Sequence, residues 1–285
     1  MARVDLRNRA NVAGDWFVDT RCIDCGTCRD IAPDLFVATA GSSVVRRQPV
    51  DGEVDGAWLA AQACPTTSIG TMSRSPRPGR LYPREVRPGS GVFDLGYSAE
   101  SSFGASAWLV VRPDGNVLVD SPRFTEALAA PIAELGGIDH VALTHRDDVA
   151  DARRWADRFG SRSWIHVDDR RAAPWTTDVL TEEQELVPDL LAIPVPGHTK
   201  GSVAFLLEDH WLFSGDSLAW SHEREDLTAF RDACWWSWSE QTVSLARLAE
   251  RHRFAAVLPG HGARHVGDAD DLHDRLVRLV ERMRR

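Results

Sequence analysis

Four cysteines in the first quarter of the chain constrain its fold more than any other feature. Cys22, Cys25 and Cys28 are spaced three residues apart, and Cys64 follows much later with Pro65 directly behind it. The first three cysteines are too crowded for an ordinary disulfide framework, and their spacing suits thiolate ligands in a reducing compartment. Thiolates are the soft ligands that iron–sulfur clusters and zinc prefer. We therefore expect the first part of the chain to fold around a metal.

The spacing C-x-x-C-x-x-C with a distant C-P is a ligand pattern of iron–sulfur clusters. Residues 14–70 resemble the single-cluster bacterial-type ferredoxins in this spacing, in Gly26 within the loop and in the trailing Pro65. The resemblance implies a 4Fe-4S cluster held by four ligands, Cys22, Cys25, Cys28 and Cys64. A zinc ion on the same cysteines is the alternative, and a 3Fe-4S form has no support because none of the four is missing.

A segment rich in proline and arginine divides the chain. Residues 73–89 contain four prolines and five arginines and lack a periodic apolar face, which predicts an extended linker. It separates a small domain, residues 1–72, from a larger one, residues 90–285. The small domain can bury little apolar area, so metal ligation would supply the missing stability.

The larger part alternates strand-like and helix-like runs, which indicates a layered α/β domain. Strands are predicted at 107–111, 116–120, 139–143, 163–167, 190–195, 202–207, 210–214 and 255–259. Helical apolar faces are predicted from three sets: Val149, Ala152, Ala156 and Phe159; Val243, Leu245, Leu248 and Ala249; Leu272, Leu276, Leu279 and Val280.

Charge and hydropathy exclude several partner classes. The formal net charge of −9 makes nucleic acid a poor partner. The charged start of the chain has no apolar core of a signal peptide, and no run approaches the roughly 18 apolar residues of a membrane span. We expect a cytoplasmic protein without membrane contact.

Four segments of the larger part each place a metal-type ligand just after a predicted strand: 143–151, 194–202, 212–220 and 257–265. As an ordered set, with PGHTKGS, SGDSL and PGHG, they resemble the metallo-β-lactamase superfamily over residues 90–285. The resemblance implies an αββα sandwich of two mixed sheets flanked by helices, joined here to a small α+β ferredoxin-like domain. It also implies metals held by loops along one edge of the sandwich.

The resemblance carries four ligands over to this chain. His145 matches the first histidine of the family's T-H-x-H-x-D-H motif, and His198 matches the histidine of its PGH segment. Asp216 matches the aspartate that bridges two metals, and His261 matches the final histidine of the second metal. In addition to binding metal, Asp216 is a candidate catalytic residue that orients a reacting water.

The first motif departs from the family pattern. Its second histidine is Asp147 here, and its aspartate and last histidine fall on Val149 and Ala150. A shifted match lets Asp151 replace the lost aspartate, which would give it a ligand or water-orienting role. The second metal would otherwise keep two ligands, fewer than such sites need. We therefore expect one well-occupied ion and a weak or absent second.

The altered ligand set has chemical consequences. His145, Asp147 and His198 form a two-histidine, one-carboxylate set, which favours non-haem iron. The flavodiiron proteins of this superfamily also have a carboxylate at the second position. Zinc accepts the same ligands and stays open as the alternative.

Some of these residues have simpler interpretations. Asp147 stands at an expected helix N-terminus, where acidic side chains are stabilising. His261 can serve as a hydrogen-bond donor to a metal ligand instead of binding the metal itself. Asp120 follows a predicted strand and is expected to be a turn residue, with support of the pocket as the alternative. Lys200 is expected to be solvated surface, although contact with an anionic substrate is open.

Cys234 is the odd cysteine and lies among Trp235, Trp236 and Trp238. We expect a buried free thiol in a hydrophobic patch. The alternatives are a residue that lines the pocket, and tryptophans that pack the two domains together.

Three functions follow from these patterns. We favour an oxidoreductase, in which the cluster takes an electron from a donor protein and passes it to iron that activates dioxygen or reduces a small substrate. The second is a hydrolase of an ester, thioester, lactone or phosphoester, with Asp216 or Asp151 orienting a metal-bound water and a structural or regulatory cluster. The third is a non-enzymatic electron carrier, in which the larger domain is a degenerate module that serves only for docking.

Overall fold

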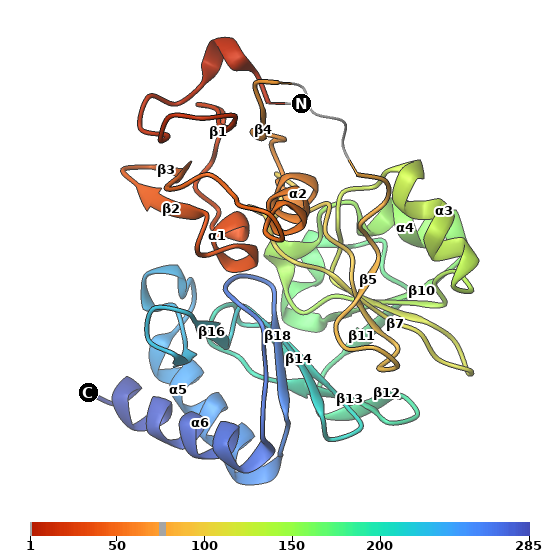
Figure 1. The fold of residues 1–285 in the computed structure, drawn as a ribbon. Helices are drawn as coiled ribbons and strands as arrows, with labels where there is room; N and C mark the ends of the chain where they lie inside the picture. The colour runs from red at the N-terminus through yellow and green to blue at the C-terminus, as the bar shows by residue number, and fades with distance from the viewer. Residues whose placement is uncertain (1, 74–77) are drawn as a thin grey trace.

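A small N-terminal unit lies against one end of a larger layered domain in the computed structural model, which describes residues 2–73 and 78–285 (Figure 1). Residues 74–77 of the predicted linker lie outside the described residues. Within the described residues, no helix is long and apolar enough to cross a membrane.

The N-terminal unit is a small α+β fold with its own core. Trp16 and Trp58 pack edge to face at its centre, with ring centroids 4.8 Å apart, a favoured arrangement for aromatic pairs. One antiparallel pair joins the two ends of the unit, and a hairpin lies beside it. Its elements are η1 (Val4–Leu6), β1 (Trp16–Val18), α1 (Thr27–Ile31), β2 (Phe36–Thr39), β3 (Ser42–Val45), α2 (Val54–Ala63) and β4 (Ile69–Thr71).

The larger domain contains two mixed sheets that pack face to face. The first sheet has the order β11-β10-β9-β8-β7-β6-β5, and the second has the order β12-β13-β14-β15-β18-β19. The first sheet comprises β5 (Arg84–Glu85), β6 (Val92–Asp94), β7 (Trp108–Val110), β8 (Val117–Val119), β9 (His140–Ala142), β10 (Arg162–His166) and β11 (Asp178–Leu180). The second comprises β12 (Gln184–Val187), β13 (Leu190–Pro194), β14 (Val203–Leu207), β15 (Trp211–Gly215), β18 (Ala256–Pro259) and β19 (His265–Val266). A separate pair is formed by β16 (Ala219–Ser221) and β17 (Asp226–Thr228).

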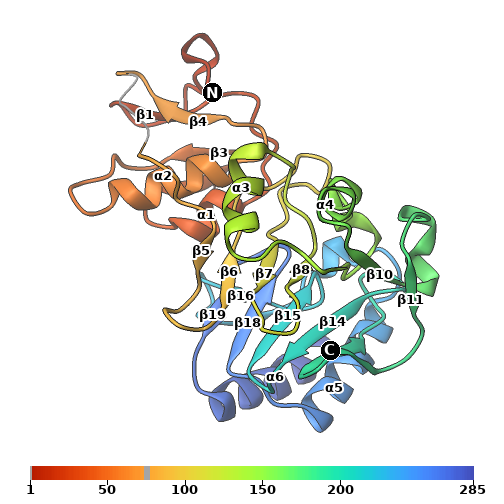
Figure 2. The ribbon, with the colours of Figure 1, turned by 90° about the vertical axis from the view of Figure 1, so that its right-hand side faces the viewer.

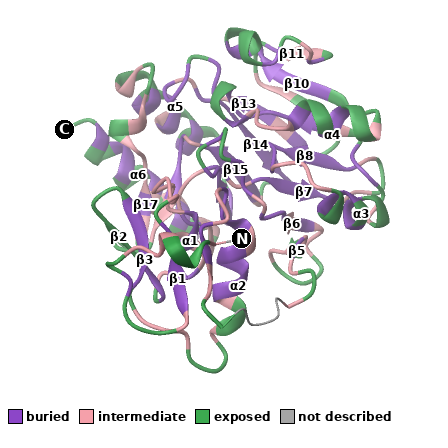
Figure 3. Cartoon of the chain, turned by 90° about the horizontal axis from the view of Figure 1, so that it is seen from above, coloured by how far each residue is buried: buried purple, intermediate pink, exposed green. Residues whose placement is uncertain are grey.

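Helices cover the outer face of each sheet, which confirms the αββα sandwich. In Figure 2, α5 and α6 lie below the second sheet, and α3 and α4 lie on the other side of the molecule. One apolar cluster fills the space between the sheets, and two more lie beneath the helix layers. The central strands of both sheets are therefore buried, while the edge strands are partly exposed and the helices keep exposed outer faces (Figure 3). The helices are α3 (Glu126–Glu134), α4 (Ala152–Phe159), α5 (Trp238–Arg251) and α6 (Ala269–Met283), with the short turns η2 (Arg146–Asp148), η3 (Val167–Ala172) and η4 (Arg231–Ala233).

All eight predicted strands of the larger domain are present, as β7, β8, β9, β10, β13, β14, β15 and β18. The predicted linker has more structure than its composition suggested. Arg84–Glu85 forms the edge strand β5, and the ring of Tyr82 is buried in the core beneath α3 and α4. The division of the chain at residues 73–89 stays a prediction, but its second half packs as part of the sandwich.

The two units share a core. Leu59 and Ala63 of α2 belong to the same apolar cluster as Tyr82 and Leu95 of the larger domain. Tyr82 also donates its hydroxyl to the carbonyl of Leu59, at 3.3 Å. The N-terminal unit therefore packs directly against the sandwich through apolar contacts and this hydrogen bond.

One predicted helical face was partly wrong. Leu245, Leu248 and Ala249 of α5 are buried, but Val243 is 53% exposed. Val243 lies two residues before Leu245, and residues two apart do not share a helix face.

Leu245→Ala is expected to lower the free energy of unfolding by about 2–5 kcal/mol, because it leaves a cavity beneath the second sheet. Val243→Ala on the same helix should change it by no more than about 0.5 kcal/mol. Urea unfolding followed by far-ultraviolet circular dichroism measures both, and equal losses would show that the helix orientation is wrong.

Candidate metal centre and cluster site

The expected metal ligands gather at one edge of the sandwich because of the strand directions. His145 follows β9, His198 follows β13, Asp216 follows β15 and His261 follows β18. β15 and β18 run parallel, and β13 runs in the same direction because two antiparallel pairings separate it from β15. The carboxyl ends of strands that run the same way meet at one edge, so these four side chains come together.

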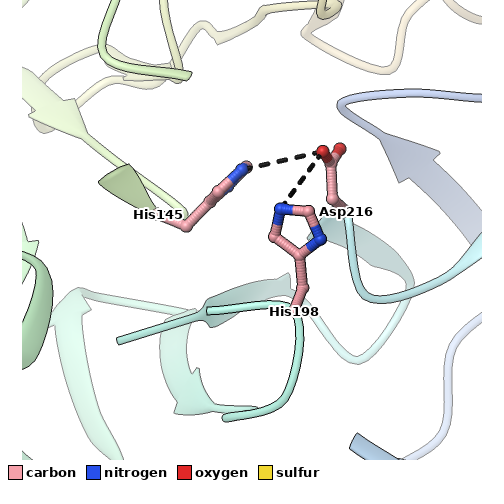
Figure 4. A group of neighbouring side chains, drawn as sticks. All are labelled: His145, His198 and Asp216. Atoms are coloured by element: carbon pink, nitrogen blue, oxygen red, sulfur yellow. Dashed lines mark ion pairs between the residues drawn. The ribbon is translucent and has the colours of Figure 1, made fainter. Parts of the chain in front are cut away.

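The first group consists of His145, His198 and Asp216, whose ligand atoms lie within 4.8 Å of one another. Each histidine has its Nε2 3.6 Å from Oδ2 of Asp216 (Figure 4). Both Nε2 atoms are buried and have no hydrogen-bond partner. Buried polar atoms are rarely left unpaired, and a cation between the three side chains would satisfy them.

His145 is held in the form that binds metals. Its Nδ1 lies 2.9 Å from the hydroxyl of Thr144, which in turn donates to Asp120 at 2.8 Å. Burial lowers the pKa of His145 to about 4, so its imidazole is neutral at pH 7 and Nε2 is free to ligate. Asp120 is therefore a buried support of the pocket, and its expected role as a simple turn residue was wrong.

The second group consists of Asp148, Asp216 and His261. His261 points Nδ1 at both carboxylate oxygens of Asp216, each at 2.9 Å. Asp148 is fully buried, and neither of its carboxylate oxygens has a hydrogen-bond partner. Gly260 leaves the space for them, since a Cβ there would lie 2.6 Å from Asp148 and 2.7 Å from Asp216.

The electrostatics of the second group are also compatible with a bound cation. Burial raises the pKa of Asp148 well above its ordinary value, and the nearby Asp216 carboxylate raises it further. An ionised carboxylate in such a position is stable only beside a compensating positive charge. A bound metal supplies that charge, so these residues fit a metal.

Sequence reasoning missed Asp148 as a ligand. It occupies an unspecified position of the T-H-x-H-x-D-H motif, one residue before the expected aspartate. The short turn η2 carries Asp148 inward, a compression that motif spacing does not reveal. The only available signal was the pair of adjacent acids, Asp147 and Asp148.

Asp151 is not brought to either group. Its carboxylate accepts a hydrogen bond from the backbone N–H of Phe124 at 2.7 Å and lies 3.7 Å from Arg154. The shifted match that gave Asp151 a ligand or water-orienting role is therefore not supported by its contacts. Because Asp148 supplies a third ligand instead, the reason for expecting a weak second ion no longer holds.

Asp147 lies at the open side of the pocket. Its side chain is 43% exposed, with Oδ2 3.5 Å from Nε2 of His198 and 4.0 Å from Nε2 of His145. The nearby imidazole of His198 lowers the pKa of Asp147. It is placed to complete the first group as a further ligand, and it caps no helix in the described residues.

The four cluster cysteines line a single cavity, together with the apolar side chains of Val18, Ile23 and Ile69. Backbone N–H groups point at two of the sulfurs, from Ser43 to Cys22 at 3.4 Å and from Ser68 to Cys64 at 3.3 Å. Burial raises the pKa of the Cys25 and Cys28 thiols. Thiolates in this position need the positive charge of bound iron, and N–H donors to sulfur are common around such clusters.

The cluster site and the metal groups are close neighbours. Gly104 packs against Cys25, and the carbonyl of Phe103 accepts a hydrogen bond from Nε2 of His261 at 3.3 Å. A cavity of about 510 Å³ also lies between the two units, with Cys25 and Asp30 on one wall and His261 on another. Direct contacts through Phe103 and Gly104 therefore join the two sites at this point.

The other singled-out residues lie outside the ligand groups. Cys234 is half-buried, and its thiol donates to the carbonyl of Gly197 beside the first metal group. Trp235 is 61% exposed and Trp236 is also exposed, so neither packs the two units together. Lys200 is exposed and pairs with Asp168 at 2.9 Å, as expected for a surface residue.

Comparison with known families gives two matches that together span most of the chain. Residues 18–71 match the model of the 4Fe-4S single cluster domain of Ferredoxin I. Residues 92–282 match the model of the metallo-beta-lactamase superfamily.

Two curated relatives match part of the larger domain. A hydroxyacylglutathione hydrolase from Acidiphilium cryptum is 34% identical over 119 residues, which cover 39% of this chain and 48% of the relative. The uncharacterized protein YmaE from Bacillus subtilis is 27% identical over 128 residues, 42% of this chain and 44% of the relative. The chain thus spans under half the length of these curated relatives.

Solved structures share the fold. The metallo-beta-lactamase FIM-1 from Pseudomonas aeruginosa, in its mono-zinc form, superposes with a TM-score of 0.55 at 19% identity, covering 72% of this chain and 97% of that one. VMB-1 gives a TM-score of 0.55 at 18% identity, covering 71% and 97%. ETHE1 from Myxococcus xanthus gives 0.50 at 20% identity, covering 67% and 84%.

Asp148→Asn is expected to weaken metal binding by the second group at least about tenfold, since even indirect partners of ligands contribute that much. Asp151→Asn is the matched control and should bind as the wild type does. Elemental analysis and Zn²⁺ titration measure both variants. Equal binding by wild type and Asp148→Asn would contradict the ligand assignment.

Cys64→Ser is expected to abolish or destabilise the cluster, because it removes one of four thiolates. Cys234→Ser should retain it, because Cys234 lies outside the cluster cavity. Iron and acid-labile sulfide content and the visible absorbance measure the outcome. Wild-type protein that holds zinc at these cysteines and no sulfide would contradict the cluster assignment.

Proposed function

Because the chain belongs to the metallo-beta-lactamase superfamily and carries a ferredoxin-type cluster domain, we propose that it is a metal-dependent oxidoreductase. In this proposal electrons enter at the 4Fe-4S cluster and are used at the metal centre of the sandwich. When bound, the cluster supplies single electrons, and an iron ion in the pocket supplies a redox-active site for dioxygen or a small substrate.

The observation that carries the proposal is the short connection between the two sites. Gly104 is in contact with the cluster ligand Cys25, and its neighbour Phe103 is hydrogen-bonded to His261 of the second metal group. A hydrolase does not need an electron carrier packed this closely against its metal ligands. The two units also share an apolar core, to which α2 contributes Leu59 and Ala63.

The ligand set supports iron. His145, His198 and Asp216 are a two-histidine, one-carboxylate set, the arrangement typical of non-haem Fe(II) sites with open positions. Asp147 and Asp148 add carboxylates around it, and these hard oxygen ligands suit iron better than a thiolate would. The chain's own residues hold the metal and keep His145 neutral, while the exposed side of Asp147 leaves an approach open.

The cavity between the two units is our candidate for the substrate site. Its volume of about 510 Å³ is in the range of small-molecule pockets, which often lie between domains. Arg84 and Arg264 supply positive charge to its walls, and Asp30 and Asp94 supply negative charge. We further propose that an electron-donor protein reduces the cluster, and that the free cysteines place the chain in the reducing cytoplasm.

Hydrolysis is the second candidate. It is supported by the partial match to a hydroxyacylglutathione hydrolase and by the second metal group, since many hydrolases use two metals. Asp216 lies between the two groups and is placed to orient a metal-bound water, whereas Asp151 is not. A docking-only larger domain is disfavoured, because buried, unpaired ligand atoms are costly unless they bind something.

The proposal is tested with anaerobically purified protein. We expect iron beyond that of the cluster, and we expect His198→Ala to lose it while retaining the cluster. When the cluster is reduced with dithionite and mixed with dioxygen, the wild-type cluster should be reoxidised several-fold faster than that of His198→Ala. His210→Ala is the control, since His210 lies on a distant turn and should behave as the wild type does.

Two outcomes would reject the proposal. One is zinc in the pocket with equal reoxidation rates in wild type and His198→Ala. The other is hydrolysis of a hydroxyacylglutathione thioester at the same rate with the cluster oxidised and reduced, which would favour the hydrolase.

A further inference from the structure

Residues 99–106, here named the bridging segment, are fixed to the cluster loop at one side. The hydroxyl of Thr27 donates to the carbonyl of Gly104 at 2.9 Å and lies 3.3 Å from the sulfur of Cys25. Gly104 adopts φ +91°, and a Cβ on it would lie 2.8 Å from the Cβ and sulfur of Cys25. The bridging segment therefore follows the position of the cluster loop closely.

The same segment is fixed to the metal centre at its other side. The carbonyl of Phe103 accepts from Nε2 of His261 at 3.3 Å, and the backbone N–H of Ser106 donates to the carbonyl of Gly260 at 2.7 Å. Gly260 directly precedes His261 and makes room for the carboxylates of the second metal group. Two hydrogen bonds thus attach the bridging segment to the ring of His261 and to the carbonyl of the residue before it.

The conformation of Phe103 is unusual in a way that indicates a role. It is a bulky residue with φ +51°, in the left-handed region that favours glycine, and its side chain is 53% exposed. Burial of the ring therefore does not explain the strained backbone. What this backbone achieves is to aim the Phe103 carbonyl at His261, and such strain is often found at functional sites.

The hydrogen bond to Phe103 decides which nitrogen of His261 faces the metal. Nε2 donates its proton to the carbonyl, so Nδ1 is left to face Asp216 and the second metal group. Partners of this kind fix the tautomer and orientation of metal-binding histidines. A displacement of the bridging segment removes that constraint from His261, whereas the hydrogen bonds that attach the segment to the metal centre do not involve His145 or His198.

We propose that the bridging segment couples the two sites, so that the ordered cluster loop, through Thr27 and Gly104, positions His261 for metal binding. Thr27 is a positioning residue in this scheme. The coupling regulates metal occupancy of the second group and leaves the first group unchanged. It goes beyond the proposed function, because it requires the metal centre but holds whether the chemistry is redox or hydrolytic.

The test is a Co²⁺ titration of full-length protein that retains its cluster and has been freed of pocket metal. The Co²⁺ equivalent bound by the second group is identified as the one that Asp148→Asn weakens. Thr27→Val removes the hydroxyl bridge, and Thr27→Ser keeps it. Gly104→Ala displaces the segment by a clash on the cluster side, because its Cβ meets Cys25 and Thr27.

Thr66→Val is the matched control. Its hydroxyl lies 3.6 Å from the sulfur of Cys64, so it also removes a hydroxyl beside a cluster ligand. The Thr66 hydroxyl contacts Cys64 and Ser68, both of which lie outside the bridging segment.

We expect Thr27→Val and Gly104→Ala to weaken the second Co²⁺ equivalent about tenfold, the lower end of the effect of indirect ligand partners. Thr27→Ser and Thr66→Val should bind as the wild type does, and the first equivalent should be unchanged throughout. If Thr27→Val and Gly104→Ala bind both equivalents normally, or weaken both equally, the coupling is refuted. If either variant loses its cluster while its circular dichroism spectrum stays native, wild-type affinity for the second Co²⁺ equivalent refutes the coupling, and a selective loss of that affinity supports it.

Discussion

The buried carboxylate of Asp216 is the interaction on which the metal centre depends. It faces three imidazoles, from His145, His198 and His261, and belongs to both ligand groups. Burial opposes its ionisation, but these histidines, His261 above all, hold its pKa below the ordinary value. The loops that follow β9 of the first sheet and β13, β15 and β18 of the second meet at the Asp216 carboxylate. This explains why they lie at a single edge of the sandwich.

That edge is also where the cluster unit is attached. The small unit contributes α2 side chains to the sandwich core, and its cluster loop contacts the segment that precedes β7. A small domain gains stability both from bound iron and from such a shared core. The consequence is that the cluster cannot shift without disturbing contacts one residue away from a metal ligand.

Much of this arrangement could be predicted from sequence, for a physical reason. The cysteine spacing and the residues that follow β9, β13, β15 and β18 are local patterns, and each strand delivers its own ligand to the edge. Asp148 was missed because a short turn changes which residue of a motif points inward. Phe103 and Gly104 were missed because they act through a backbone carbonyl and through lack of a side chain, which leave no chemical signature in sequence.

Other differences come from tertiary packing. Arg84–Glu85 pairs as an edge strand although its surroundings are rich in proline and arginine. Asp120 is held in the pocket through Thr144, a contact between the ends of two neighbouring strands. Trp235 and Trp236 are exposed although their apolar character favoured a buried patch, and their backbone N–H groups both donate to the carbonyl of His198.

The claim central to this account is that the cluster and the pocket metal are close enough to influence each other. Electron paramagnetic resonance of the reduced cluster tests it most directly, with Co²⁺ or diamagnetic Zn²⁺ in the pocket. Nearby Co²⁺ should broaden the cluster signal and speed its relaxation, relative to Zn²⁺. Identical cluster signals with the two ions, both shown to be bound at His145, His198 and Asp216, would contradict the account.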